Sequence, residues 1–396
     1  MDILFEWLGY IGRWSHVLAA ITWIGTSFYF NWLDLSERPA QGARFKPNVE
    51  GTLHEMHGGS FYYHERYWPT EDHPRTLAHS GPAQLTFLTG VFLIIHIYWL
   101  GADAYLVKGA GSLPAPLVIG ASALLLTIPW LIYHALVKSC RDERVILASV
   151  AALVLGLGFV ASQLFSPRAA IVHIGAALGT IMALNVHFVI VPNHIRMRKQ
   201  VKAGVPVDLT YHQLAKRRSQ HNNYLTLPVL FAMLSVHFPL ATGTRFAWLL
   251  TFFIMAAGFL VRYHRNIYLA TDRKRPELQL LALLFLIAAI ALSFIPVPRE
   301  TQDTASLSAK DAAAFQIVET RCTVCHSAAP VIPDFGSPPA GVRLETLDQI
   351  RALKSQILTV AVESDLMPPS NWTEITDQER AELGQWLQTL GTTTGE

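Results

Sequence analysis

Residues 321–330, near the end of the chain, read RCTVCHSAAP and contain the pattern Cys-x-x-Cys-His. This pattern is the signature of c-type haem attachment, in which Cys322 and Cys325 form thioethers and His326 ligates the iron. A chance match or one half of a zinc site is the alternative interpretation. A haem held in this way carries single electrons, so residues elsewhere in the chain must take those electrons from a substrate.

The residues around this motif predict a small helical domain. Met367, followed by two prolines in SDLMPPSNW, is the candidate for the second axial ligand, and His/Met ligation raises the reduction potential of a haem. An amphipathic helix is expected to end in the motif, and a last helix to begin at a capping box formed by Thr376 and Glu379. Residues 309–396 are therefore expected to form a class I cytochrome c domain with one covalent haem c.

Histidines in apolar stretches are a second group of candidates, because ionisable residues inside a membrane are costly and usually functional. His173 and His187 are 14 residues apart, which corresponds to ~21 Å along a helix and ~40° around it. This spacing resembles that of di-haem cytochrome b helices. With His16 and His237 they are the candidate axial ligands of haem b, and a hydrogen-bonded core histidine is the alternative for each.

Two polar segments complete the candidates. In residues 35–80, His57 precedes two glycines, where the backbone can approach a ligand closely, although a solvated re-entrant or amphipathic segment explains the composition equally well. The segment QHNNY brings Asn222, Asn223 and Tyr224 to the mouth of an apolar stretch. These side chains can bind the edge of a planar polar heterocycle, and helix capping is the competing account.

These candidates must be positioned by helices that cross a membrane. Hydrophobic residues make up 51% of the chain and charged residues 15%, against ~25% charged in soluble proteins. Eight apolar stretches are long enough to span ~30 Å of hydrocarbon as helices. They are residues 9–34, 81–101, 115–137, 146–164, 170–192, 224–241, 246–263 and 278–296.

Lysine and arginine predict the orientation of these spans. The connections after the second, fourth and sixth spans contain one basic residue each, namely Lys108, Arg168 and Arg245, whereas the odd connections contain several. By the positive-inside rule the odd connections are cytoplasmic, so both termini are expected to be periplasmic in a bacterial inner membrane. No cleavable signal peptide is evident. The haem motif then lies outside the cytoplasm, where c-type haem is attached.

Four segments carry a resemblance to a known family: RWSHVLAAITWIGTSFYFNWLD, HGGSFY, RAAIVHIGAALGTIMALNVHFVIVPN and SQHNNYLTLPVLFAMLSVHFP. Together they resemble the bacterial membrane-bound urate oxidase family, in which an eight-span domain is joined to a carboxy-terminal cytochrome c. Residues 77–89 depart from the family pattern, since they keep His79 but lack its tryptophans and glutamate.

The resemblance implies the oxidation of urate, or a related purine, to 5-hydroxyisourate in purine degradation. Electrons would pass to the fused cytochrome and on to a soluble cytochrome c or terminal oxidase, without hydrogen peroxide. The expected fold is all-α: a polytopic bundle of about eight spans over residues 1–298, a linker over 299–308 and the cytochrome domain. No nucleic acid partner is expected, and a homo-oligomer is compatible with the chain.

Given such a substrate, we predict a cytoplasmic pocket that attracts the urate anion with nearby Lys and Arg. His57 and His221 are the candidate bases, since imidazole titrates near physiological pH. The predicted substrate-binding residues are Arg66, Asn222, Asn223 and Tyr224. The alternative functions are a di-haem b/c module that uses quinol or a partner dehydrogenase, and a haem-handling membrane protein, because SHVLAAITWIG also resembles protoporphyrinogen-oxidising membrane proteins.

Overall fold

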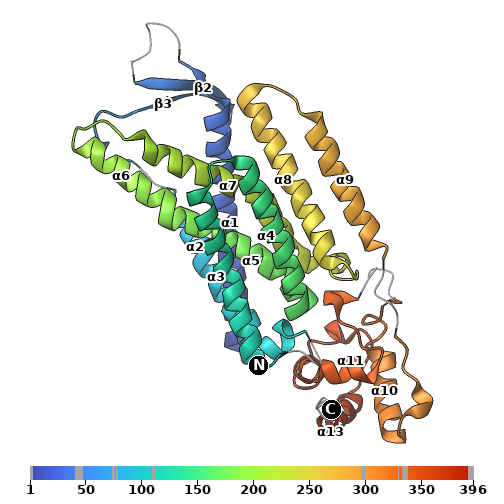
Figure 1. Cartoon of the computed structure of the whole chain (residues 1–396). Coiled ribbons are helices and arrows are strands. Elements are labelled where there is room, and N and C mark those ends of the chain that lie inside the picture. The colour runs from blue at the N-terminus through green and yellow to red at the C-terminus, as the bar shows by residue number, and fades with distance from the viewer. Residues whose placement is uncertain are drawn as a thin grey trace.

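A computed structural model describes residues 3–40, 48–73, 76, 79–108, 113–295, 300–328, 330–331 and 338–390 of the chain. Long helices form a bundle, and a smaller helical domain lies at one end of it (Figure 1). The start of α1 lies at that same end, whereas the strands β2 and β3 lie at the opposite end (Figure 1). The predicted domain boundary at residues 298–299 lies outside the described residues.

All eight predicted stretches fall on helices of the bundle. The helices are α1 (Ile3–Ser36), α2 (Gly81–Leu93), α3 (Ala115–Ser139), α4 (Glu143–Leu164), α5 (Pro167–Asn185), α6 (Val191–Lys202), α7 (Leu209–Leu234), α8 (Ala247–Thr271) and α9 (Pro276–Ser293). Wide π-helical turns extend α2 at Ile94–Trp99, follow it at Ala102–Leu106 and join α5 to α6 at Val186–Ile190. Short 3₁₀ turns after α7 cover Ser235–His237 and Pro239–Ala241.

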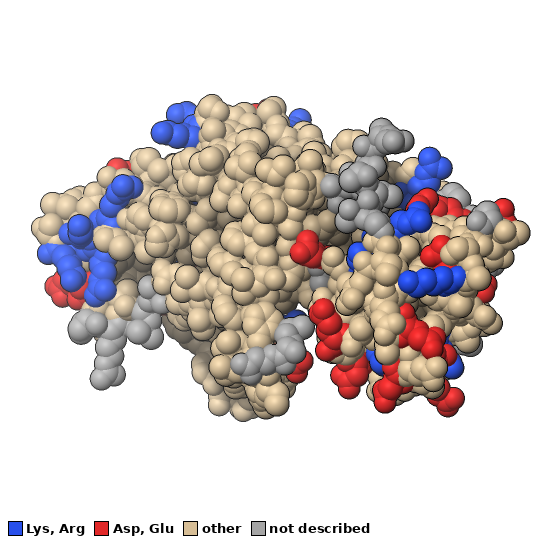
Figure 2. All heavy atoms as spheres, turned by 90° about the horizontal axis from the view of Figure 1, so that it is seen from below, with Lys and Arg blue, Asp and Glu red and all other residues tan. Residues whose placement is uncertain are grey.

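Six helical segments of the described chain are long and apolar enough to cross a membrane. They are Gly81–Trp99, Ala115–Ser139, Glu143–Leu164, Pro167–Lys202, Ala247–Thr271 and Pro276–Ser293. Helices α1 and α7 do not qualify by composition, so the count of eight spans stays a prediction. Figure 2, viewed toward the end that carries the small domain, shows carboxylates gathered on that domain and few charges over the centre of the bundle.

The all-α expectation is wrong for the segment between α1 and α2. Strands β2 (Val49–His57) and β3 (Ser60–Tyr67) form an antiparallel hairpin, and β1 (Arg38–Pro39) pairs with β2. Gly58 and Gly59 form its turn with φ of +59° and +81°, which suits a two-glycine hairpin connection. Aromatic residues dominate β3, and this composition favours a strand over the solvated re-entrant or amphipathic segment considered from the sequence.

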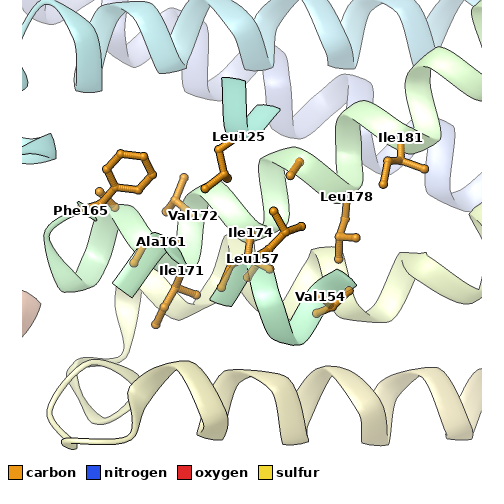
Figure 3. Packing of buried hydrophobic residues seen from close by; sticks show 14 of the residues in the cluster. Leu125, Val154, Leu157, Ala161, Phe165, Ile171, Val172, Ile174, Leu178 and Ile181 are labelled. Carbon is orange, nitrogen blue, oxygen red and sulfur yellow. The ribbon is translucent and has the colours of Figure 1, made fainter. Parts of the chain in front are cut away.

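Helix α5 lies at the centre of the bundle. Half of the most apolar window of Pro167–Lys202 is buried, against 11% for α9. Its side chains Ile171, Ile174 and Leu178 pack against residues of α4 such as Leu157 (Figure 3). Small residues let neighbouring helices approach it closely, because a Cβ atom at Gly175 would collide with Ala232 of α7.

We predict that Gly175→Val destabilises the bundle by about 1–3 kcal/mol, the usual cost of overpacking. The added side chain would have to displace Ala232 and Met233, which line the contact with α7. The matched control is Gly179→Val on the same helix, since no atom lies within 4 Å of a Cβ built there. Thermal unfolding of the detergent-solubilised chain measures both variants, and equal midpoints would contradict the predicted close contact.

The small domain has its own apolar core. Helix α10 (Ala309–Arg321) ends at the haem motif as predicted, and α13 (Asp377–Thr389) begins at the predicted capping box of Thr376 and Glu379. Leu383, Trp386 and Leu387 of α13 are buried against α10 and the middle helices. The remaining elements are α11 (Leu347–Ala352), α12 (Lys354–Ile357), a π turn at Leu358–Val362 and 3₁₀ turns at Thr304–Ser306, Pro339–Gly341 and Pro369–Asn371.

Two carboxylates make the stability of this domain depend on pH. Hydrogen bonds from Ser308 and from the Trp386 indole lower the pKa of Asp311, and the Thr376 backbone and Arg321 lower the pKa of Glu379. A lowered folded-state pKa adds stability that is present above the ordinary value and lost on acidification. We therefore expect the domain to lose thermal stability as the pH falls below about 4.

This pH dependence is measured by thermal unfolding of the full chain between pH 3 and pH 7. In Asp311→Asn the Trp386 indole keeps a side-chain acceptor but the titrating group is gone. The variant should lose less stability than the wild type over the acid range. An unchanged acid slope would contradict the assignment to Asp311.

Candidate functional site

The segment QHNNY lies inside helix α7, with helix on both sides of it. The helix-capping account of this segment is therefore wrong. His221, Asn222 and Asn223 are 5%, 5% and 1% exposed, so three consecutive polar side chains are buried in the bundle. Because consecutive helical residues are ~100° apart, they face different neighbours, and each finds polar partners on another helix.

His221 connects two groups on α3 and α4. Its Nδ1 lies 2.7 Å from the Tyr133 hydroxyl, and its Nε2 lies 2.8 Å from Glu143 Oε2. Asn185 donates to the Tyr133 oxygen, so the tyrosine O–H donates to Nδ1 and His221 donates from Nε2 to the carboxylate. The Tyr133 hydroxyl is buried and the Glu143 side chain is 49% exposed, so this chain of hydrogen bonds leads from the interior toward solvent.

A further layer on α5 supports this chain. Asn185 donates to Asn222 Oδ1 at 3.0 Å, and the Asn222 amide donates to the Met182 carbonyl at 2.8 Å. Arg218, 5% exposed, donates to Asn185 Oδ1 and lies over the Tyr133 ring at 4.8 Å. The polar groups of Asn222 are thus satisfied within the protein, and the layer holds Tyr133 in place.

The opposite side of α7 faces α8 and α1. Asn223 Oδ1 accepts from Arg262 Nε at 2.8 Å and from Asn266 Nδ2 at 2.9 Å. Asn31 of α1 donates to Asn266 at 3.0 Å, and the Arg262 guanidinium lies 3.9 Å from the centre of the Phe28 ring. This second cluster therefore joins α1, α7 and α8, because Asn266 of α8 bonds both Asn31 and Asn223.

Of the other predicted pocket residues, His57 and Arg66 lie apart from these clusters and Tyr224 adjoins the second one. His57 is exposed at the tip of the hairpin, and Arg66 on β3 binds the carboxylates of Glu37 and Glu50. Tyr224 packs its ring against aromatic residues of α8, and its hydroxyl is hydrogen-bonded to Asn266 of the second cluster. His221, Asn222 and Asn223 lie on one turn of α7 and face different helices. His57 does not reach them, because it is exposed at the tip of a hairpin whose Glu55 accepts a hydrogen bond from Tyr29 of α1.

Comparison with known proteins decides the family. A family model described as urate oxidase N-terminal matches residues 2–294, which include the whole bundle. The chain belongs to the urate oxidase N-terminal family. Membership makes it a urate-related oxidoreductase. No curated protein and no solved structure matches the chain.

The small domain follows the residues matched to the urate oxidase N-terminal family, and its geometry fits a covalent haem. Cys322 and Cys325 are free thiols, and burial raises the pKa of Cys322 to about 12. His326 Nδ1 donates to the Val342 carbonyl at 3.1 Å, which leaves Nε2 for a metal, the usual arrangement of a ligating histidine. Met367 packs against the same core as Cys322.

The zinc alternative finds less support in this domain. No group of three His, Cys, Asp or Glu side chains converges anywhere in the described part of the chain, and a structural zinc site needs four ligands. Cys322, Cys325, His326 and Met367 would instead hold one haem c, by two thioethers and two axial ligands.

The four histidines predicted for haem b do not form a site in the urate oxidase N-terminal domain. Both ring nitrogens of buried His173 are bonded, to the Ser122 hydroxyl and the Ala169 carbonyl, each at 2.8 Å. His187 is exposed where the helix widens into the π turn, although the spacing predicted one shared face. His16 bonds Thr89 at 3.0 Å, and His237 is exposed after α7. These residues do not fit an axial pair.

Several members of the clusters were not identified from the sequence, among them Tyr133, Glu143 and Arg262. Tyr133 and Arg262 lie in predicted spans, where a polar side chain is itself a signal of function. Glu143 and Arg262 also lie near the predicted cytoplasmic ends of spans, where charges are ordinary. Only the packing of α3, α4 and α8 on α7 identifies them as partners.

Proposed function

We propose that the chain oxidises urate to 5-hydroxyisourate at the polar layer around α7 and delivers the electrons to a haem c in its carboxy-terminal domain. The family match over residues 2–294 carries this proposal. It is supported by the buried polar clusters in a bundle with a large apolar core, and by a domain with the residues of a c-type haem site at its end.

The reaction requires a place for protons as well as electrons. Urate and one water give 5-hydroxyisourate, two protons and two electrons, so atoms and charge balance without oxygen or peroxide. A c-type haem accepts one electron at a time, and two reductions are needed per urate.

The Tyr133–His221–Glu143 chain can carry the protons. Tyr133 passes its proton to His221 Nδ1 while His221 releases the proton on Nε2 to Glu143, and the tyrosinate then takes up a proton that the oxidation releases. Glu143 stabilises the imidazolium that forms in between. Arg217 holds the other carboxylate oxygen at 2.6 Å and keeps Glu143 in position.

The positions of the polar layer around α7 and of the haem-motif domain support transport of electrons along the bundle. The start of α1 and the haem-motif domain lie at one end and the hairpin at the other, in agreement with the predicted orientation (Figure 1). Basic residues such as Arg196 and Lys199 belong to α6, near the hairpin end, and favour the approach of an anion (Figure 1).

The proposal is tested with the purified full chain under anaerobic conditions. Addition of urate to the oxidised protein should reduce the haem c, with two equivalents reduced per urate and no hydrogen peroxide formed. If quinol reduced the haem and urate did not, the proposal would be overturned and an electron-transfer module would be favoured.

A further inference from the structure

Asn223 and Arg262 leave two hydrogen-bond donors without an acceptor inside the bundle. The Nδ2 atom of Asn223 and one terminal nitrogen of Arg262, Nη2, are buried, and neither has a partner within the described residues. A buried donor without an acceptor costs ~1–3 kcal/mol, and more when it is charged. Such a pair on adjacent side chains therefore calls for an explanation.

The neighbouring contacts fix where these donors point. The oxygen of the Asn223 amide accepts from both Arg262 Nε and Asn266 Nδ2, so its NH₂ group must point away from them. Asn31 holds Asn266 in turn. The Arg262 guanidinium carbon lies over the Phe28 ring, 3.9 Å from its centre. The two open donors are thus fixed in direction before any ligand arrives.

The charge of Arg262 also lacks compensation. No carboxylate within the described ranges lies at ion-pair distance from it, whereas Arg66 and Arg217 each bind at least one. A cation inside an apolar bundle is costly and normally pairs with an opposite charge. An anion that also accepts hydrogen bonds would satisfy the charge and the donors together.

We propose that Asn223 and Arg262 bind the anionic edge of urate, an inference that rests on the proposed function. Urate is a planar monoanion at neutral pH, and its carbonyl oxygens and deprotonated nitrogen are acceptors along one edge. A planar guanidinium presents parallel N–H donors that match such an edge. The site selects an anionic, acceptor-bearing purine over a neutral purine of the same shape.

Direct binding of radiolabelled urate to the full chain, by equilibrium dialysis, tests this assignment. Arg262→Gln should weaken binding roughly 10- to 100-fold, the effect of losing a charge-assisted hydrogen bond. Arg265→Gln is the matched control, because Arg265 lies one turn later on the same helix and is exposed. Neutral hypoxanthine should bind the wild type weakly. Its own dissociation constant, measured by competition, should be the same in Arg262→Gln.

A second variant keeps the test informative if Arg262→Gln folds poorly. Asn223→Asp retains the oxygen that accepts from Arg262 and Asn266 but supplies an internal carboxylate that occupies the guanidinium. It should lose urate binding while haem content and thermal stability stay unchanged.

The outcomes separate this inference from the proposed function. If wild-type haem is reduced by urate but both variants bind urate normally, the inference is overturned and the proposed function stands. If the wild type neither binds nor oxidises urate, both the inference and the proposed function are overturned. Loss of binding in the two variants, with the Arg265 control intact, supports the site.

Discussion

His221→Gln is expected to slow urate-dependent reduction of the haem by at least 100-fold, with haem content unchanged. A positioned acid–base group contributes ~10²–10⁴-fold, and His221 is the only titrating link between the Tyr133 hydroxyl and Glu143 in the chain of hydrogen bonds described. Glutamine has similar size and can bond one of the two partners, but it cannot accept and release a proton. Stopped-flow reduction of the haem by urate under anaerobic conditions measures the effect.

His134→Gln provides the control for this experiment. His134 belongs to the same helix as Tyr133 and lies next to the network, but its Nδ1 has no partner within the described residues. Its replacement should leave the reduction rate within a few-fold of the wild type. A normal rate in His221→Gln, or equal losses in both variants, would rule out the relay.

Replacement of both Cys322 and Cys325 by alanine is expected to abolish covalent haem and all electron delivery to an external acceptor. The thioethers need both sulfur atoms, and the half-buried His326 alone would not retain haem through denaturing electrophoresis. Urate binding should persist, because its proposed site lies in the bundle. Haem staining of denaturing gels, acceptor reduction and urate binding are measured on the same preparation.

Cys140→Ala is the matched control, since Cys140 ends α3 and lies outside the haem domain. This variant should keep full haem staining and activity. Persistent haem staining in the double variant would refute thioether attachment at these cysteines. Loss of urate binding in that variant would contradict the separation of the two sites.

The positions of the helices follow closely from the sequence. Apolar stretches of about 20 residues predict helices because the backbone of such a segment must satisfy its own hydrogen bonds in hydrocarbon, and all eight stretches are helical. The capping box at Thr376 and the helix before Cys322 are equally local, since their hydrogen bonds join residues three or four apart. The hairpin was missed because histidines and carboxylates in that segment suggested a site rather than a strand.

Side-chain partners could not be read in the same way. His173 and His187 have the spacing of a di-haem helix, yet one bonds Ser122 and the other is exposed at a π turn. Periodicity assumes a regular helix and specifies a face, but it does not specify what packs against that face. The predicted six-residue pocket likewise required His57 and Arg66 of the hairpin to meet the QHNNY segment, but His57 is exposed and Arg66 binds Glu37 and Glu50.

The sequence by itself determined the family, the helical positions, the haem motif and the importance of QHNNY, because each depends on residues close together in the chain. The tertiary structure decided that His221 bonds Tyr133 and Glu143, and that Asn223 bonds Arg262. Those contacts join helices far apart in sequence, and their geometry depends on how small residues such as Gly175 let the helices pack. Burial sets the energetic cost of an unpaired donor or charge, since that cost is large only where water cannot reach the group.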